Sequence, residues 1–436
     1  MGPTYDILLK NASYLTPDME LASGDIAMSG GRIAALLPAN SGVPADRVLT
    51  GNGLLWMPGL VDGHTHTSQQ LLRGRLLDEK PVIWKRVNVP FECRLDEESS
   101  RLSAQLAALE MIHSGTTGFI DAGGKYADVF AQVYEASGLR GRLTCFTNDN
   151  APEPLRCGTV EEGVRRLREL RGSLSGRLQG YFSVTALTAA SETLFRSVLE
   201  AAAEAGAPVE IHMNEYASEV SDFIERYGSR PFEYLEAHGL LETPFIAPHC
   251  IFLSPDEMEI IRRKQVRVVH CPFSNCGKGV PDTPQLLSRG VSVGFGSDGS
   301  AHGGVDLFRE MRLFRGVQNA VRGVGTADSQ VMPARTLLKM TTQGGAAAML
   351  EDGGGRIAPG APADLIAVDM DQPHLWPTQN AVNTLVESAS GRDVVHMIVD
   401  GRLVMEDRQV LTLDERAILA QARALLDRQP HLARWA

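Results

Sequence analysis

The sequence predicts an α/β protein: a TIM-like (β/α)8 barrel with a small β-sandwich built from both chain ends. Two observations support this fold class. Short apolar runs alternate with helical patterns through the middle of the chain, and both ends carry alternating apolar residues around glycine-containing turns. At 436 residues the chain is long for one domain, yet one barrel with additions fits that length.

Eight runs rich in β-branched or aromatic residues follow one another as buried strands would. They span residues 60–66, 116–123, 142–148, 178–184, 208–215, 244–250, 266–272 and 291–298. Between most of them lie helical patterns such as 98–115 and 191–206, each ending at a glycine as a helix C-terminus would. This alternation predicts a parallel barrel. A doubly wound open sheet is the alternative, but no glycine-rich phosphate loop follows the first strand.

The two chain ends carry hairpin signals and are expected to fold together, with the barrel inserted between them. The last stretch has the pattern of an amphipathic helix and a tail. The predicted division is therefore an N-terminal part of the sandwich at 1–57, the barrel at 58–354, a C-terminal part of the sandwich at 355–411, and a helix with a tail at 412–436.

Composition excludes several classes of partner. A formal net charge of -11 and a pI near 5.5 argue against a nucleic-acid or anionic membrane partner, because either favours an excess of Lys and Arg. The N-terminus lacks a basic segment followed by a long apolar stretch, and no window reaches the length of a membrane span. Six scattered cysteines favour reduced thiols. We therefore expect a cytoplasmic protein.

Two histidines one residue apart, His64 and His66, close the first predicted strand. Side chains at i and i+2 of an extended chain point the same way, so both rings can reach one ion. A bare His-x-His pair fits an ordinary polar strand end equally well. The metal interpretation therefore needs further ligands elsewhere.

Polar residues also close later strands. His212 and Glu215 follow the fifth, His249 the sixth and Asp298 the eighth. Taken singly, each has an ordinary interpretation: a core histidine, a helix-initiating acid or a helix N-cap. The carboxyl ends of barrel strands share one face, so all of these side chains are expected to meet at one mouth. The predicted ligands, with one position left open for water, are His64, His66, His212 and Asp298.

Stretches along nearly the whole chain match one known superfamily. They are "PGLVDGHTHTSQQLLRG", "EMIHSGTTGFIDAG", "HMNE", "APHC", "HCPFSN", "VGFGSDGS", "LFREMR" and "GAPADLIAVD". With them the sequence resembles the amidohydrolase superfamily, and within it the cytosine deaminase-like branch of S-adenosylhomocysteine and methylthioadenosine deaminases, guanine deaminases and triazine hydrolases. The resemblance is specific for the superfamily and less so for the substrate.

The resemblance implies that the four predicted ligands bind one divalent metal, Zn²⁺ or alternatively Fe²⁺. Such a metal lowers the pKa of its water to about 7, so a hydroxide nucleophile exists at neutral pH. The catalytic residues would be Asp298, which orients the water, Glu215, which carries protons, and His249, which polarises the oxygen that forms. A binuclear site usually needs a lysine at the end of strand 4. The stretch "LQGYFSVTALT" has none, which favours one metal.

Substrate contacts are implied more weakly. The segment "VIWKRVNVPFECRL" resembles the one that offers a Trp to the pocket and a Glu to ribose hydroxyls in adenosine-type deaminases, here Trp84 and Glu92. A core Trp and a surface Glu are the alternative. Gln69, with Gln70 beside it, follows the ligand pair and is expected to read ring nitrogens, unless both amides face solvent. His270, after strand 7, is expected to line the pocket or to support its wall.

Two departures from the resemblance put a nucleoside in doubt. The strand 4 stretch "SVTALTAAS" lacks the histidine that relatives present to the purine, and the loop after Asp298 carries His302 as a further pocket residue. The arginines that hold a homocysteine carboxylate have no clear counterpart, although Arg156 could serve. These departures shift our preference slightly towards a bare ring.

The function predicted is hydrolytic deamination of an aromatic nitrogen heterocycle of the purine, pterin or triazine type, with or without a ribose. Displacement of a halide or alkylamine from a similar ring is the alternative. A catalytically silent barrel would have lost a ligand or Glu215, and all are present. The expected partners are a small heterocyclic substrate and other copies of the chain, as a homodimer or a larger homo-oligomer.

Overall fold

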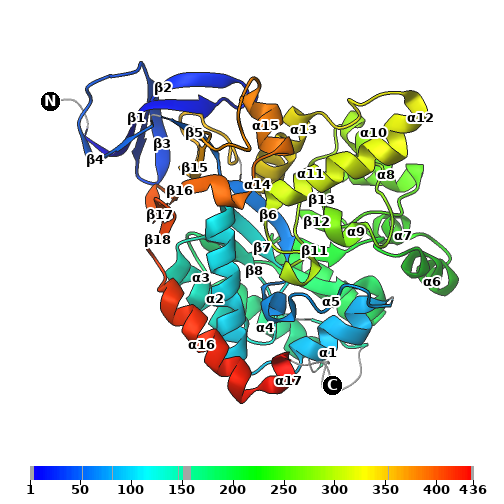
Figure 1. The fold of residues 1–436 in the computed structure, drawn as a ribbon. Coiled ribbons are helices and arrows are strands. Elements are labelled where there is room, and N and C mark those ends of the chain that lie inside the picture. The colour runs from blue at the N-terminus through cyan, green and yellow to red at the C-terminus, as the bar shows by residue number, and fades with distance from the viewer. Residues whose placement is uncertain are drawn as a thin grey trace.

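The computed structural model describes residues 4–51, 53–80, 82–145, 147–150, 159–351 and 353–433. Figure 1 shows a layer of strands from both chain ends beside a larger body in which strands alternate with helices. In the described part of the chain, no helix combines the length and apolar character that crossing a bilayer requires.

Two parallel sheets form the centre of the larger body. The first contains, in order, β6 (Leu60–Thr65), β7 (Thr116–Asp121), β8 (Arg140–Leu143) and β9 (Leu178–Gly180). The second contains β10 (Phe182–Ala186), β11 (Val209–His212), β12 (Phe245–Pro248), β13 (Arg267–His270) and β14 (Val293–Phe295). Only Tyr181 separates β9 from β10, so together they occupy the fourth predicted run.

Seven of the predicted runs coincide closely with these strands, which confirms the predicted alternation. The run predicted at 142–148 is the exception, because β8 lies at Arg140–Leu143. After Leu143 the pairing becomes irregular: the Thr144 hydroxyl donates to the Tyr181 carbonyl at 3.0 Å, and an isolated bridge joins Cys145 to Gly124. The third strand therefore ends earlier than its apolar pattern indicates.

Helices follow the strands. Both predicted helices are confirmed, as α2 (Glu97–Ser114) and α5 (Glu192–Glu204). α2 begins where Asp96 accepts from the Ser99 N–H at 2.8 Å, and it ends at Gly115 with φ +84°. The other α-helices of six or more residues in the described part of the chain are α3 (Ala127–Ser137), α4 (Val160–Ser173), α6 (Ala217–Tyr227), α7 (Pro231–Ala237), α8 (Pro255–Arg263), α10 (Thr283–Ser288), α11 (Leu307–Gln318), α13 (Ala334–Lys339), α15 (Ala381–Glu387) and α16 (Glu415–Arg428).

Apolar side chains from both parallel sheets meet in one cluster. The strand contributions include Val61, Ile120, Ile246 and Val269, and Met349 packs against them. β14 also approaches β6 closely, because the Asp298 N–H donates to the His64 carbonyl at 3.0 Å. A Cβ added to Gly296 would lie 2.6 Å from that same carbonyl oxygen, so only glycine fits there. The ends of β6 and β14 are thereby held together.

The strands of the two chain ends form one nine-stranded sheet, as predicted for segments that fold together. Its members are β1 (Tyr5–Leu15), β2 (Leu21–Ser29), β3 (Arg32–Leu37), β4 (Ala45–Thr50), β5 (Leu54–Pro58), β15 (Leu365–Asp369), β16 (Val394–Val399), β17 (Arg402–Glu406) and β18 (Gln409–Val410). The antiparallel pairing of β5 with β15 joins the two ends. The predicted C-terminal helix is α16, which packs beside α2 (Figure 1).

Candidate metal and substrate site

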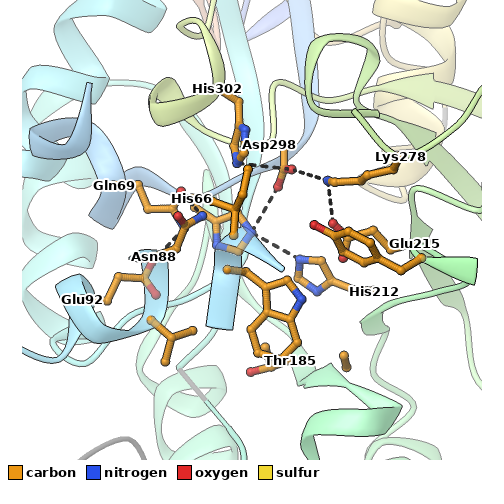
Figure 2. Close-up of a pocket in the computed structure, with 15 residues that line it drawn as sticks. His66, Gln69, Asn88, Glu92, Thr185, His212, Glu215, Lys278, Asp298 and His302 are labelled. Atoms are coloured by element: carbon orange, nitrogen blue, oxygen red, sulfur yellow. Dashed lines mark hydrogen bonds and ion pairs between the residues drawn. The ribbon is translucent and has the colours of Figure 1, made fainter. Parts of the chain in front are cut away.

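The predicted ligands lie at the carboxyl ends of the parallel strands. His64 lies within β6 and His66 just beyond it; His212 is the last residue of β11, and Asp298 follows β14. Figure 2 shows His66, His212 and Asp298 turned towards one another. The His66 and His212 Nε2 atoms are 3.2 Å apart, and Asp298 Oδ1 lies 3.4 Å from the Nε2 atom of both His64 and His66. The structure therefore brings all four side chains together.

His249, predicted as a polarising group, lies in the same cluster. Ligand atoms of His64, His212, His249 and Asp298 all lie within 4.8 Å of one another. His249 has a φ of +70° and Asp298 a φ of +55°, both in the left-handed region that non-glycine residues rarely adopt. Hydrogen bonds hold these turns, since the His249 N–H donates to the Val269 carbonyl at 2.7 Å. Such strain is typical of functional sites.

Two buried imidazole nitrogens indicate that the cluster can hold a cation. His64 Nδ1 is bound to the Glu210 carboxylate, and His249 Nδ1 lies 3.0 Å from Asn275 Oδ1. The Nε2 atoms of both rings lack a hydrogen-bond partner within the described ranges. A carboxylate behind a histidine fixes the ring and leaves Nε2 free as a ligand, as in carboxylate–histidine–zinc arrangements. Three imidazoles and one carboxylate fit Zn²⁺ or another borderline divalent metal.

The protonation of the cluster differs from one ring to the next. Burial, and then the neighbouring histidines, lowers the pKa of His212, and burial followed by Lys278 lowers the pKa of His249. Both rings are therefore neutral near pH 7, as metal ligands must be. Burial lowers the pKa of His64 too, but Glu210 and Asp298 overcome this and raise it to about 10. A metal at His64 must therefore displace a proton.

Lys278 is a residue of this site that the sequence analysis missed. Its Nζ atom lies 2.5 Å from Glu215 Oε1 and 3.7 Å from Asp298 Oδ2, and it donates to Ser274 Oγ at 2.6 Å. The side chain is only 6% exposed, and despite burial the two acids raise its pKa above the usual range. Lysines are seldom buried unless they are paired. The only signal in the sequence is its place a few residues beyond strand 7.

A pocket adjoins the cluster, with about 530 Å³ of empty space that is partly open to solvent. Of the predicted residues, it is lined by His66, Gln69, Trp84, Glu92, His212, Glu215, Asp298 and His302. It is also lined by residues that were not predicted, namely Ile83, Asn88, Val89, Thr185, Ala186, Tyr216 and Lys278. Thr185 occupies the strand 4 region that lacks the expected histidine. His302 Nε2 lies 4.0 Å from Asp298 Oδ2, so the altered loop does reach the site.

Glu92 lies on the side of the pocket away from Lys278 (Figure 2). It is 9% exposed, and its Oε1 atom accepts hydrogen bonds from Ser68 Oγ at 2.6 Å and Gln69 Nε2 at 3.1 Å. Asn88 Nδ2 in turn donates to Gln69 Oε1 at 3.3 Å. Burial raises the pKa of Glu92. The carboxylate is therefore fixed in the pocket wall, which differs from a helix-surface glutamate.

The remaining predicted residues lie elsewhere. His270 is buried behind His249, with Nδ1 2.8 Å from the His249 carbonyl oxygen and its ring stacked on Phe314. That place matches support of the pocket wall, the second of its two predicted roles. Gln70 donates to Glu110 Oε2 at 2.7 Å, outside the pocket lining. Arg156 lies outside the described residues.

Comparison with known proteins gives consistent matches. The model of the amidohydrolase family matches residues 55–404. A 5-methylthioadenosine/S-adenosylhomocysteine deaminase of Pelotomaculum thermopropionicum is 35% identical over 428 residues, 96% of this chain and 97% of the relative. A 5'-deoxyadenosine deaminase of Methanosarcina acetivorans is 35% identical over 425 residues, with the same coverage. A crystal structure of a Xanthomonas campestris adenosine deaminase with bound zinc has a TM-score of 0.91 at 28% identity and covers 98% of this chain and 99% of that one.

The metal cluster generates the first prediction. Protein loaded with zinc and then desalted should retain close to one equivalent per chain, and His66→Ala should lose most of it because one of four ligands is gone. Metal analysis of both proteins measures this. His374→Ala, at a half-exposed histidine outside the cluster, is the control and should retain zinc. Two tightly bound equivalents in the unaltered protein would contradict a mononuclear site.

Proposed function

The chain belongs to the amidohydrolase family, and from that membership we propose that it is a metal-dependent aminohydrolase that deaminates an adenosine-type nucleoside. The observation that carries the proposal is the convergence of His64, His66, His212 and Asp298 beside the acid Glu215, at the mouth of a buried pocket. A hydrolase acting on carbon–nitrogen bonds needs an activated water and a proton carrier, and this arrangement offers both.

We propose that the three histidines and Asp298 hold one divalent metal, with zinc preferred over iron. When bound, such an ion lowers the pKa of a water ligand to about 7. His64 Nε2, which lies 3.4 Å from Asp298 Oδ1 without a hydrogen bond among the described residues, supports this assignment, as does the 3.2 Å distance between the His66 and His212 Nε2 atoms. The bound zinc in the structure of the Xanthomonas relative supports the choice of metal.

Glu215 is proposed as the proton carrier of the reaction. It lies three residues beyond His212, lines the pocket and is buried. The Lys278 ammonium, 2.5 Å from its Oε1 atom, holds the carboxylate in place. From there Glu215 can take a proton from the attacking water, give one to a ring nitrogen and help to protonate the departing ammonia.

His249 and Asp298 are proposed to act beside Glu215. His249 Nε2 lies 3.8 Å from Glu215 Oε1. In the tautomer that carries its proton on Nε2, the ring donates to the oxygen that forms on the attacked carbon. Asp298 accepts a hydrogen bond from the attacking water and so fixes its direction.

The ribose is proposed to bind at Glu92. A buried carboxylate whose Oε1 atom is already fixed by Ser68 and Gln69 is well placed to accept hydrogen bonds from vicinal hydroxyls. Trp84 and Asn88, both from the π-helical turn Trp84–Asn88, also line the pocket. The names of the two relatives described above give adenosine-type nucleosides as their substrates. This weighs against the preference for a bare ring that the sequence suggested.

We also propose the finer architecture. The two parallel sheets would close into one (β/α)8 barrel over 58–354, supported by the hydrogen bond between Asp298 and His64. The terminal sheet would form a β-sandwich from 1–57 and 355–411, followed by the helix and tail at 412–436. Scattered cysteines support a reducing, cytoplasmic location. We further propose that the chain assembles as a homodimer or a larger homo-oligomer.

The role of Glu215 generates a second prediction. Glu215→Gln is nearly isosteric and leaves all four ligands intact, but it removes the acid/base group. Zinc content should be unchanged and turnover should fall by at least about 100-fold. Glu225→Gln, at an exposed position on α6, is the matched control and should retain turnover. Near-normal turnover of Glu215→Gln would show that another group carries the proton.

Lys278 generates a third prediction. Lys278→Met keeps the length and the apolar stem of the side chain but removes the ammonium that positions Glu215. We expect zinc to be retained and kcat to fall by about 10-fold or more, with a smaller change in KM, because the lost contact acts on the proton carrier. Steady-state kinetics at saturating zinc measures the split. A rise in KM alone would instead indicate that Lys278 only binds substrate.

The assignment of the ribose generates a fourth prediction and tests the substrate class. Ammonia release should be efficient with adenosine and 5'-deoxyadenosine, which differ at a position that the Glu92 carboxylate need not contact, and poor with adenine, a pterin or a triazine. A carboxylate that binds both hydroxyls contributes about 1.5 to 3 kcal/mol. Glu92→Ala should therefore lower kcat/KM for adenosine roughly 10- to 150-fold and hardly change that for adenine.

The control for Glu92 is Glu97→Ala, which removes an exposed glutamate on α2 and should change neither substrate. If adenine and adenosine were turned over equally, and Glu92→Ala changed kcat/KM for neither, the proposal that Glu92 binds a ribose would be wrong. The metal assignment would still stand.

A further inference from the structure

The segment that carries Glu92 packs against the last helix that the structure describes. Glu92 ends α1 (Val89–Glu92), which follows the π-helical turn Trp84–Asn88, and we call residues 83–92 the substrate segment. α17 (Pro430–Ala433) follows α16 and lies beside α1 in Figure 1. Two parts of the chain that are far apart in the sequence therefore meet next to the substrate pocket.

An apolar cluster joins these two parts. Its buried members come from the loop after β6, the substrate segment and the turn after it, α2, the loop beyond Asp298, α16 and α17. They are Leu72, Leu76, Val87, Phe91, Leu95, Leu102, Ala301, Leu425 and Leu432. Ile83, which lines the substrate pocket, packs against this cluster. Leu425 and Leu432 are fully buried, so α16 and α17 complete the cluster.

Arg75 connects α17 to the residue before Glu92. Its Nη2 atom donates to the Leu432 carbonyl oxygen, and its guanidinium carbon lies over the Phe91 ring, 5.9 Å from the ring centre. A guanidinium can make both contacts at once, since it donates in its plane and stacks with its face. The position of Leu432 is thereby coupled to that of Phe91, which is adjacent to Glu92 in α1.

Two polar contacts fix the place where α17 begins. Gln429 Nε2 donates to Asp96 Oδ2 at 2.8 Å, and Arg428 forms an ion pair with Glu98 at 2.5 Å. Asp96 is also the residue that caps the start of α2. The end of α16 is therefore attached to the beginning of α2, and α17 continues from there towards Arg75.

The cluster supports the ribose contact from both sides. Glu92 adjoins Phe91 of the cluster. The hydrogen-bond donors to Glu92, Ser68 and Gln69, lie in the 3-10 turn Thr67–Leu72, whose last residue also belongs to the cluster. The proposed metal ligands lie instead at or just beyond the ends of β6, β11 and β14. A shift of α17 therefore acts on the ribose contact before it acts on the metal site.

We propose that Arg75 and α17 position Glu92, and that they thereby set a preference for nucleosides with free vicinal hydroxyls. Neither lines the substrate pocket, so both act through Phe91 and Glu92. This inference rests on the proposed binding of a ribose by Glu92. Coupling between two sites is reciprocal, so a nucleoside bound at Glu92 also stabilises the docked position of α17.

The first test compares adenosine with 2',3'-dideoxyadenosine, which lacks the vicinal hydroxyls, on the zinc-loaded full chain. Arg75→Met keeps an apolar side chain but loses both guanidinium contacts. It should raise KM for adenosine about 5- to 10-fold with little change in kcat, and change neither constant for the dideoxy substrate. Arg75→Lys should recover part of the loss, since its ammonium can still donate to Leu432. Arg94→Met, at an exposed arginine just beyond the substrate segment, is the matched control and should affect neither substrate.

A second test measures the reciprocal effect on the unaltered protein by hydrogen exchange and mass spectrometry. The backbone amides of Gln429 and Leu432 donate to the carbonyls of Leu425 and Gln429, so their exchange reports whether α17 is formed and docked. Saturating inosine, the expected product, should slow this exchange about 3-fold or more, whereas hypoxanthine should not. The effect of inosine should vanish in Glu92→Ala.

Each contrary outcome has one meaning. An equal rise in KM for adenosine and the dideoxy substrate, or a loss of zinc, would show that Arg75 supports the whole pocket, and would overturn the inference. An unchanged KM for adenosine in Arg75→Met, while Glu92→Ala lowers kcat/KM, would overturn it and leave the proposed function intact. If Arg75→Met does not fold, exchange at α17 that inosine leaves unchanged overturns the inference by itself. Failure of Glu92→Ala to affect adenosine would remove the proposed ribose contact, and the inference with it.

Discussion

The close approach of β14 to β6 is the constraint on which the rest of the site depends. Gly296 allows the two backbones to approach closely, and the hydrogen bond from the Asp298 N–H to the His64 carbonyl accompanies the left-handed conformation of Asp298. That conformation turns one carboxylate oxygen to His64 and His66 and the other to Lys278. Asp298 thereby joins the proposed metal ligands to the groups that would move protons.

Charge compensation explains why these polar groups are tolerated in a buried pocket. An unpaired buried charge is costly, and a pair that loses one member destabilises a protein strongly. Here Glu210 is bound to His64, and Glu215 and Asp298 share Lys278. Among the described residues, the Nε2 atoms of His64 and His249 face carboxylates without a hydrogen bond, and a cation between them would satisfy the site.

The regular alternation of strand and helix patterns in the sequence predicted which strand ends would meet, and with them most of the proposed metal ligands. His64, His212 and Asp298 could be placed together because the carboxyl ends of barrel strands share one face. Lys278 could not, since it lies on a loop whose path depends on contacts such as the Ser274 hydrogen bonds rather than on a repeating pattern. The role of Glu210 could not be predicted for another reason. Within an apolar strand, the sequence does not indicate which neighbouring side chain a charged residue contacts.

The substrate contacts were the least predictable part. The network of Ser68, Gln69 and Glu92 joins two segments whose packing no local rule determines. The sequence showed the missing strand 4 histidine but not that Thr185 would line the pocket in that region.

The central claim is that one metal ion lies among His64, His66, His212 and Asp298. Anomalous diffraction at the zinc absorption edge, from crystals of the zinc-loaded protein, tests it most directly. The account predicts a single strong peak within bonding distance of the three histidine nitrogens and Asp298. Two peaks in the pocket, or one peak that His66 or Asp298 does not reach, would contradict it.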